Sequence, residues 1–173
     1  MADFDWDENE RPLGYLITFR TYGTWLHGDE REAMDRHGQN IYGTPRMAVN
    51  ENLESMMREN RTKDSVVLST KQRDVVAASI KETCKLRDYL LMALNIRTNH
   101  GHVVAASADR PEKLITAFKA NATRALRQAG LVAADARVWS RGGSRRYLWK
   151  PSHVDGAIDY VLYGQGDDIP PHW

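Results

Sequence analysis

Two histidines one residue apart are the strongest candidates for chemistry in this sequence. The six histidines include one close pair, His100 and His102, in the run Asn-His-Gly-His-Val-Val. On a β-strand, side chains at positions i and i+2 point to the same face, so both imidazoles could bind one metal ion. Such a pair also occurs by chance and packs as ordinary structure. The spacing alone therefore predicts a candidate metal site and no particular reaction.

A second candidate group lies near the C-terminus. Tyr160 and Tyr163 are three residues apart and share one face of an expected helix. Tyrosines at helical spacing usually belong to a hydrophobic core. A tyrosine can instead act as a nucleophile when a metal ion or a base stabilises its oxyanion. A metal ion can also polarise and orient the phosphate that is attacked.

The charge of the chain is concentrated in one segment. The total is +1, but residues 110–150 carry ten basic side chains against two acidic ones, a net charge of +8. Such a segment is typical of a surface that binds a polyanion, although a solvated helix face can carry similar charge. Paired histidines, a tyrosine and a basic segment together indicate DNA strand transfer.

The sequence pattern predicts a β-α-β-β-α-β order followed by a final helix. Apolar and β-branched runs predict strands, and helical spacing after a cap residue or a proline predicts helices. The expected strands span 13–20, 89–96, 103–107 and 146–149, and the expected helices span 70–87, 111–130 and 151–163. This order is typical of a ferredoxin-like or RRM-like α+β domain. Such a domain has an antiparallel sheet with helices on one face, here with a C-terminal helix that carries the tyrosine.

One domain accounts for most of the 173 residues. We expect an acidic N-terminal arm at 1–12, a single domain at 13–166 and a C-terminal tail at 167–173. Residues 21–69 are polar and broken by glycines, which indicates an elaboration of the domain.

The composition excludes several classes of protein. No apolar run is long enough to span a membrane, and the acidic start is unlike a signal peptide. The single Cys84 excludes a disulfide framework. We therefore expect a cytoplasmic protein with no membrane partner.

Several motifs resemble a known family when they are taken together. They are Gly14-Tyr-Leu-Ile-Thr-Phe-Arg-Thr-Tyr-Gly-Thr-Trp-Leu-His-Gly-Asp29, Tyr42-Gly-Thr-Pro45, Ile96-Arg-Thr-Asn-His-Gly-His-Val-Val104, Trp139-Ser-Arg-Gly142, Arg146-Tyr-Leu-Trp149 and Tyr160-Val-Leu-Tyr-Gly-Gln165. They resemble the bacterial single-tyrosine HUH transposases, namely the REP-associated tyrosine transposases and their single-strand insertion-sequence relatives. The resemblance extends over residues 13–166.

The resemblance implies a metal-dependent single-strand DNA endonuclease and strand transferase that acts on single-stranded or hairpin DNA. In this family the HUH histidines bind Mg²⁺ or Mn²⁺, which implies the same for His100 and His102. A helix tyrosine attacks a phosphodiester and leaves a 5′-phosphotyrosine and a free 3′-hydroxyl. Its place before Val-Leu implies Tyr160, with Tyr163 as the alternative. Family members often form dimers, which implies a homodimer here. We expect the protein in the bacterial cytosol, at the nucleoid when it is bound to DNA.

Two positions depart from the family pattern. The side-chain amide that completes the metal shell commonly lies four residues after the tyrosine, but position 164 is glycine and the amide is Gln165. On a continuous helix, an i to i+5 step turns about 140° away. Gln165 can therefore be the third ligand only if the helix ends at Gly164 and the chain folds back. Otherwise water completes the shell, or Tyr163 is the nucleophile.

The second departure is Gly101, which stands where the family has a bulky apolar residue. That residue faces away from the metal and packs beneath the sheet. We expect glycine to leave the ligand face intact but to soften its support, at a cost of about 1 kcal/mol.

The basic segment supplies the expected DNA contacts. The side chains best suited to pair with phosphates are Lys119, Arg124, Arg141, Arg145 and Arg146. Trp139, Tyr147 and Trp149 are interleaved with them and could stack on unpaired bases, although packing is the more ordinary role for Trp149. His27 belongs to a matching motif and is expected to have no catalytic role.

Two other classes of function remain open at this point. A catalytically inactive, domesticated module could bind single-stranded DNA or RNA on the same fold, as the displaced amide and Gly101 would allow. A metal hydrolase unrelated to DNA is less consistent with the sequence, because no Asp or Glu adjoins His100 and His102.

Overall fold

The computed structural model describes residues 11–24, 65–166 and 168–172. Its elements, in chain order, are β1 (Gly14–Arg20), α2 (Thr70–Leu86), β2 (Leu90–Ile96), β3 (His100–Ala106), α3 (Pro111–Gln128), β4 (Ser144–Leu148) and α4 (Pro151–Tyr163). Most of the expected N-terminal arm and elaboration, with His27, lies outside the described residues. No helix in the described ranges is long and apolar enough to cross a membrane.

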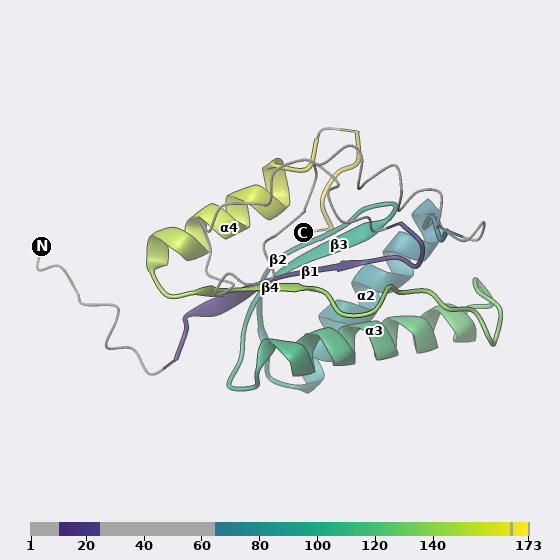
Figure 1. The fold of residues 1–173 in the computed structure, drawn as a ribbon, viewed down its shortest axis with the longest axis horizontal. Helices are drawn as coiled ribbons and strands as arrows, with labels where there is room; N and C mark the ends of the chain where they lie inside the picture. The colour runs from purple at the N-terminus through teal and green to yellow at the C-terminus, as the bar shows by residue number, and fades with distance from the viewer. Residues whose placement is uncertain (1–10, 25–64, 167, 173) are drawn as a thin grey trace, which may run out of the picture.

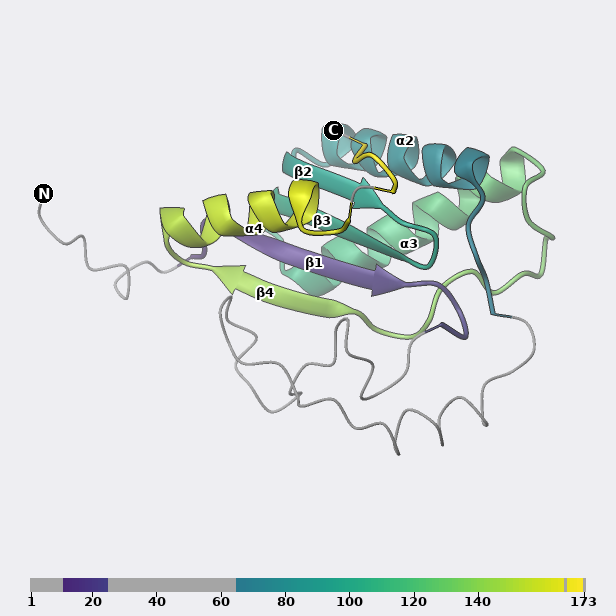
Figure 2. The ribbon, with the colours of Figure 1, turned by 90° about the horizontal axis from the view of Figure 1, so that it is seen from above.

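The described strands form one antiparallel sheet in the order β2-β3-β1-β4. Helices α2 and α3 pack on one face of this sheet and α4 packs on the other, which makes three layers (Figures 1 and 2). The order of elements and the antiparallel pairing confirm the predicted ferredoxin-like α+β fold. The two helices within the βαββαβ unit share one face, as expected, and the helix that carries the tyrosines covers the opposite face.

Alternation along the strands divides the side chains between these two faces. On β1, the side chains of Tyr15, Ile17 and Phe19 belong to the large core under α2 and α3. Leu16 belongs to a smaller apolar cluster under α4. The large core under α2 and α3 buries most of the apolar side chains. The face under α4 can therefore hold polar side chains without loss of this core.

A row of polar side chains crosses the sheet on the α4 face. Asn95, His102, Thr18 and Ser144 are register partners on β2, β3, β1 and β4. Asn95, His102 and Thr18 are each at most 7% exposed. Because buried polar groups need hydrogen-bond partners, the position of α4 over this row is constrained by the contacts described below.

The predicted helix starts are confirmed. The Ser69 side chain accepts the Gln72 N–H at 3.2 Å and Gln72 Oε1 accepts the Ser69 N–H at 2.8 Å, so the two residues form a capping box at the start of α2. Pro111 and Pro151 are the first residues of α3 and α4. A proline fits this position because the first N–H groups of a helix have no partner within it.

Two strands start earlier than the sequence pattern predicts. Strand β3 starts at His100 rather than at residue 103, and β4 starts at Ser144 rather than at residue 146. The first residues of β3 lack the apolar alternation of a strand, but His100 pairs with Arg20 on β1. Backbone pairing with β1 thus extends β3 through its polar residues. This is a tertiary effect that a local pattern does not carry.

The two described residue ranges that flank residues 25–64 contact each other, one after β1 and one before α2. A Cβ atom on Gly23 would lie 3.0 Å from the Ser65 Cα atom. The Thr21 hydroxyl donates to the Val66 carbonyl at 2.6 Å. The departing and returning segments are therefore held together at the end of β1.

Neighbouring side chains fill the space beside Gly101, which lies between the two histidines. A Cβ atom there would lie 2.7 Å from Phe19 Cζ and 2.9 Å from Ile96 Cδ1, closer than packed atoms approach. Phe19 and Ile96 are at most 1% exposed, and the Phe19 ring packs edge-on against Trp139 with centroids 5.1 Å apart. Phe19 and Ile96 therefore occupy the space that a bulky side chain would fill, and the expected softening of the support stays a prediction.

The substitution Gly101→Ala should destabilise the protein by about 1–3 kcal/mol, because the added methyl group overlaps Phe19 and Ile96. Urea unfolding of the variant and of the parent protein measures this difference. Phe19→Leu shortens the overlapping side chain, so the double variant should lose less stability than the sum of the two single changes. Equal stability of Gly101→Ala and the parent protein would contradict the packing described here.

Candidate functional site

Strand β3 and the end of α4 bring two imidazoles and a side-chain amide to a common point. The Gln165 Oε1 atom lies 2.9 Å from His102 Nε2 and 3.4 Å from His100 Nε2. The two imidazole rings have centroids 4.8 Å apart and meet edge-on. The three residues predicted as metal ligands are thus neighbours in space.

Each imidazole has a partner at its other nitrogen. Thr18 Oγ1 lies 2.8 Å from His102 Nδ1, and Asn99 Oδ1 lies 2.7 Å from His100 Nδ1. Because an amide oxygen only accepts, a neutral His100 carries its proton on Nδ1 and its lone pair on Nε2. Gln165 Oε1 also only accepts, so at 2.9 Å His102 donates from Nε2, and the Thr18 hydroxyl donates to Nδ1. A bound metal ion would instead take the Nε2 lone pairs of both rings, and His102 would then donate from Nδ1 to Thr18.

Neither Thr18 nor Asn99 was predicted from the sequence as part of the site. The available signal for Thr18 was a hydroxyl within the buried run of β1, where an unpaired polar group would be costly. Asn99 directly precedes His100, so its adjacency was visible, but its side-chain direction was not.

The position of Gln165 depends on where α4 ends. The helix ends at Tyr163, and the Gly164 N–H donates to the Tyr160 carbonyl at 3.0 Å. The Gln165 amide donates from Nε2 to the same carbonyl at 3.1 Å. Because its NH₂ group is held there, its oxygen faces the imidazoles. The structure therefore meets the condition that the sequence set for Gln165, a helix that stops at Gly164.

The donor atoms at this point fit a divalent metal ion. Ligands bound at about 2.1 Å are about 3.0 Å apart on an octahedral edge and about 3.4 Å apart in a tetrahedron. The separations of 2.9 and 3.4 Å between Gln165 Oε1 and the two Nε2 atoms match this range. The described residues include no group of three or more His, Cys, Asp or Glu that could hold a metal. The donors that do converge are two ring nitrogens and one amide oxygen.

Tyr160 and Tyr163 have different surroundings. The Tyr160 ring packs edge-on against the His102 ring, with centroids 5.3 Å apart and an interplanar angle of 72°. It is partly buried against the α4 cluster, whereas Tyr163 is 75% exposed. Of the two tyrosines, Tyr160 is the one that lies beside the histidine pair.

Asn95 joins the end of α4 to the sheet, and no sequence pattern singled it out. It is 1% exposed and adjacent to His102 in the register, and its Nδ2 donates to the Val161 carbonyl at 2.9 Å. The last carbonyls of a helix have no partner within it. Here the side chains of Asn95 and Gln165 supply donors to Val161 and Tyr160. A lone amide in the apolar strand Leu-Leu-Met-Ala-Leu-Asn-Ile was the available signal.

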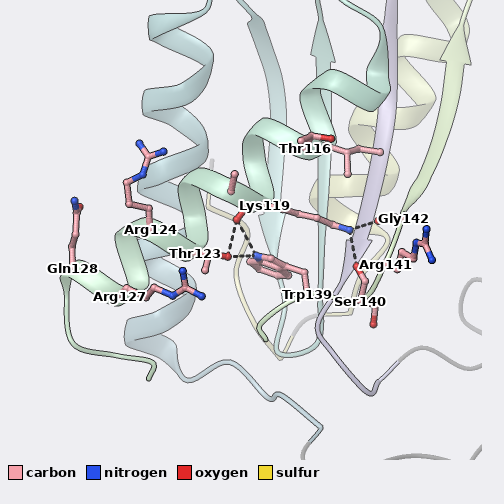
Figure 3. Close-up of a pocket in the computed structure, with 12 residues that line it drawn as sticks. Thr116, Lys119, Thr123, Arg124, Arg127, Gln128, Trp139, Ser140, Arg141 and Gly142 are labelled. Atoms are coloured by element: carbon pink, nitrogen blue, oxygen red, sulfur yellow. Dashed lines mark hydrogen bonds between the residues drawn. The ribbon is translucent and has the colours of Figure 1, made fainter. Parts of the chain in front are cut away.

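The side chains predicted to bind phosphates do not form one group. Lys119, Arg124 and Arg141 line a pocket between α3 and residues 139–142 (Figure 3). Arg145 instead pairs with Glu112, with 2.6 Å between Nε and Oε1. Arg146 is 7% exposed and belongs to the α4 face through its pairing with Leu16. The charges of these last two arginines are therefore engaged or covered.

Trp139, which was predicted to stack on bases, lies in the large core. It is 8% exposed, and its indole N–H lies 3.2 Å from the Lys119 carbonyl and 3.1 Å from Thr123 Oγ1 (Figure 3). This position leaves its ring faces little room for a base. Tyr147 and Trp149 stack on each other, with centroids 6.3 Å apart and an interplanar angle of 17°.

Arg97 ties the described part of the tail, residues 168–172, to the hairpin that carries the histidines. Its guanidinium is almost fully buried and donates to the Ile169 carbonyl at 2.7 Å and to Asp168 Oδ1 at 2.6 Å. The bond from Arg97 lowers the pKa of the Asp168 carboxyl. Because this anchor lies three residues after Gln165, it restricts how far Gln165 can move.

His172 binds the outer edge of β2. Its N–H donates to the Leu94 carbonyl and its Nδ1 accepts the Ile96 N–H, both at 3.3 Å. Its Nε2 lies 3.4 Å from Asp74 Oδ1 on α2. Burial lowers the pKa of His172, and Asp74 opposes this shift. The neutral imidazole with its proton on Nε2 satisfies both contacts.

The sequence matches no protein-family model and no curated protein. Among solved structures, the fold is similar to that of a REP-associated tyrosine transposase bound to a REP hairpin. The TM-score is 0.49 and the sequence identity is 9%, over 95% of this chain and 72% of that chain. A likeness at this level shows neither a common family nor a common activity, so the function has to be inferred from the site itself.

The contact between the tail and β2 should weaken as the pH falls. The pKa of His172 lies below its ordinary value of 6.5 when the tail is docked. Docking therefore contributes stability that is fully present above about pH 6.5 and is lost as the pH falls through the lower, docked value. Protonation also removes the acceptor of the Ile96 N–H. Hydrogen exchange of the Ile96 amide, followed by NMR, should show a protection factor that decreases over this range.

The charged groups that act on His172 come from α2. Asp74 raises its pKa, and Arg73 and Lys81 lower it. Asp74→Asn should therefore extend the loss of protection to a lower pH and make the total loss larger. A protection factor with the same pH dependence in His172→Ala would contradict the assignment to this imidazole.

Proposed function

We propose that this protein is a metal-dependent single-strand DNA endonuclease and strand transferase, an HUH-type tyrosine transposase with Tyr160 as its nucleophile. The observation that carries the proposal is the meeting of Gln165 Oε1 with the Nε2 atoms of His100 and His102, beside the Tyr160 ring. Convergent lone-pair donors next to a tyrosine suit phosphoryl transfer, whereas simple packing under α4 would call for apolar side chains.

The proposed reaction passes through a tyrosine ester. A divalent ion held by His100, His102 and Gln165 would polarise the scissile phosphate and orient it for in-line attack. The Tyr160 oxygen forms a bond to phosphorus while the bond from phosphorus to the 3′ oxygen breaks. The phenol releases its proton to solvent, and the leaving 3′ oxygen takes one up. The products are a 5′-phosphotyrosine and a free 3′-hydroxyl, and reversal with another 3′-hydroxyl transfers the strand.

The side chains around these groups restrict their geometry. His102 is fully buried and its ring is held by Thr18. The Tyr160 carbonyl fixes the amide of Gln165, and Asn95 fixes the next carbonyl of α4. Preorganisation of this kind lowers the cost of assembling the reacting groups. The basic segment at 110–150, with a net charge of +8, supports single-stranded or hairpin DNA as the partner.

The alternative is a catalytically inactive module that binds single-stranded DNA or RNA on the same fold. Two departures from the family pattern suggest this alternative: the side-chain amide lies at position 165 instead of 164, and position 101 is glycine. The reach of Gln165 to both imidazoles and the packing of Phe19 and Ile96 against Gly101 favour the catalytic proposal. The two functions differ in one outcome, the formation of a covalent link to DNA.

A covalent-capture experiment tests the proposal. The protein is mixed with 5′- or 3′-labelled single-stranded hairpin DNA from the region that flanks its gene, with Mn²⁺ or with a chelator, and run on a denaturing gel. We expect a metal-dependent adduct that carries the fragment on the 3′ side of the cleaved bond. Tyr160→Phe should abolish the adduct, and the matched variant Tyr163→Phe should retain it.

The other outcomes of this experiment are also informative. An adduct that persists in Tyr160→Phe and disappears in Tyr163→Phe would refute Tyr160 as the nucleophile. Salt-sensitive DNA binding without an adduct on any DNA tested would support the inactive binding module instead.

Metal binding can be measured without DNA. Titration of the protein with Mn²⁺ in a calorimeter should show one site, which His100→Ala and His102→Ala abolish. Thr18→Val removes the partner of His102 Nδ1 and should weaken Mn²⁺ binding by about 10–100-fold. Thr116→Val on the exposed face of α3 is the matched control and should bind as the parent protein does. Unchanged affinity in all three site variants would exclude this point as the metal site.

A further inference from the structure

A pocket of about 750 Å³ lies between α3 and residues 139–142. Helix α3 covers the face of the sheet opposite α4, so this pocket is separate from the point where the histidines and Tyr160 meet (Figure 1). Arg124 and Arg127 stand at one end of the pocket and Arg141 at the other (Figure 3). A volume of this size is typical of sites that hold a ligand.

The charge around the pocket is positive and largely uncompensated. Lys119, Arg124, Arg127 and Arg141 line it, and no acidic side chain does. Arg124 and Arg141 make no ion pair with any residue in the described part of the chain, whereas Arg145 nearby is paired with a carboxylate. A concave surface with several unpaired cations attracts polyanions.

Lys119 shapes the pocket rather than projecting into solvent. Its ammonium donates to the carbonyls of Ser140, at 2.8 Å, and of Gly142 (Figure 3). Burial lowers the pKa of this ammonium to about 8. Lys119 therefore holds the turn that carries Arg141 against α3. These contacts hold the backbone on both sides of Arg141 against α3.

One edge of the sheet, strand β4, connects the pocket to the face that carries the histidine site. Residues 139–142 lead directly into β4, which is an edge strand. Ser144, at the start of β4, pairs with Thr18, and Thr18 contacts His102 Nδ1. An extended nucleic-acid strand could therefore run from the α4 face, over the start of β4 and into the pocket, without crossing another described element.

We propose that this pocket anchors the backbone phosphates of a nucleic-acid strand at a distance from the bond that is cleaved. Arg124, Arg127 and Arg141 contact the phosphates, and Lys119 acts as a positioning residue for Arg141. That the ligand is a nucleic acid rests on the proposed function. That the pocket binds phosphate groups rests on the residues of the pocket itself. Phosphates are the groups that guanidinium forks recognise best, and an open pocket with an apolar floor also accepts the sugars between them.

Binding to labelled single-stranded hairpin DNA tests this inference. Fluorescence anisotropy is measured on the full chain with a chelator present, so that no cleavage occurs, at salt concentrations from about 50 to about 200 mM. The double variant Arg124→Gln with Arg141→Gln should bind more weakly. Its slope of log affinity against log salt should be smaller by about 1.4, since each phosphate contact on a single strand contributes about 0.7.

A charge-matched control separates the pocket from the general charge of the chain. Lys81 and Lys85 are exposed on α2, away from the pocket. The double variant Lys81→Gln with Lys85→Gln should keep the parent slope. Equal losses in the two double variants, or no loss in the pocket variant, would overturn the proposal. All of these residues are exposed, and thermal melting verifies that each variant is folded.

NMR distinguishes a strand from free phosphate and identifies where binding occurs. The DNA should shift the amide signals of Thr123, Ser140 and Gly142, and inorganic phosphate at equal phosphate concentration should shift them far less. Shifts from inorganic phosphate alone would overturn the strand as the ligand. If the pocket variant loses binding while no covalent adduct ever forms, the proposed catalysis fails and the pocket stands. If adducts form and the pocket variant binds DNA normally, the proposed catalysis stands and the pocket proposal fails.

Discussion

The main-chain carbonyl of Tyr160 accepts two hydrogen bonds, from the Gly164 N–H at 3.0 Å and from the Gln165 side chain at 3.1 Å. The first bond closes the last turn of α4, and the second turns the amide so that its oxygen faces the imidazoles. If the helix continued, residue 165 would point about 140° away from Tyr160. The geometry of the candidate site therefore depends on the end of one helix, where the proposed nucleophile and a proposed ligand share a hydrogen-bond acceptor.

The two faces of the sheet meet different physical demands. The face under α2 and α3 is apolar and holds the large core, so it can position the strands without specific polar contacts. The face under α4 carries Asn95, His102 and Thr18 almost fully buried, and each makes a hydrogen bond to another part of the site. A buried polar group without a partner destabilises the fold by more than a hydrogen bond to that group stabilises it. The polar row thus favours one placement of α4 over the sheet.

Sequence patterns were sufficient for the elements and for part of the site. Prolines and a cap residue mark the helix starts because these signals are local, and the i to i+2 spacing indicated one shared face for the histidines if they lay on a strand. The pattern did not reveal Asn95, whose partner lies on another element, or the early start of β3, which needs pairing with β1. The packing beside Gly101 was not visible in the sequence, because the ring that fills this space comes from Phe19, far away in the chain. The core position of Trp139 follows from tertiary packing in the same way.

The contact between Gly23 and Ser65 has a consequence for how this domain can vary. The forty residues from 25 to 64 leave and rejoin the domain at points that already touch. The entropic cost of closing a loop grows only with the logarithm of its length. Loop-closure entropy therefore sets only a weak limit on the length of chain that joins Gly23 to Ser65.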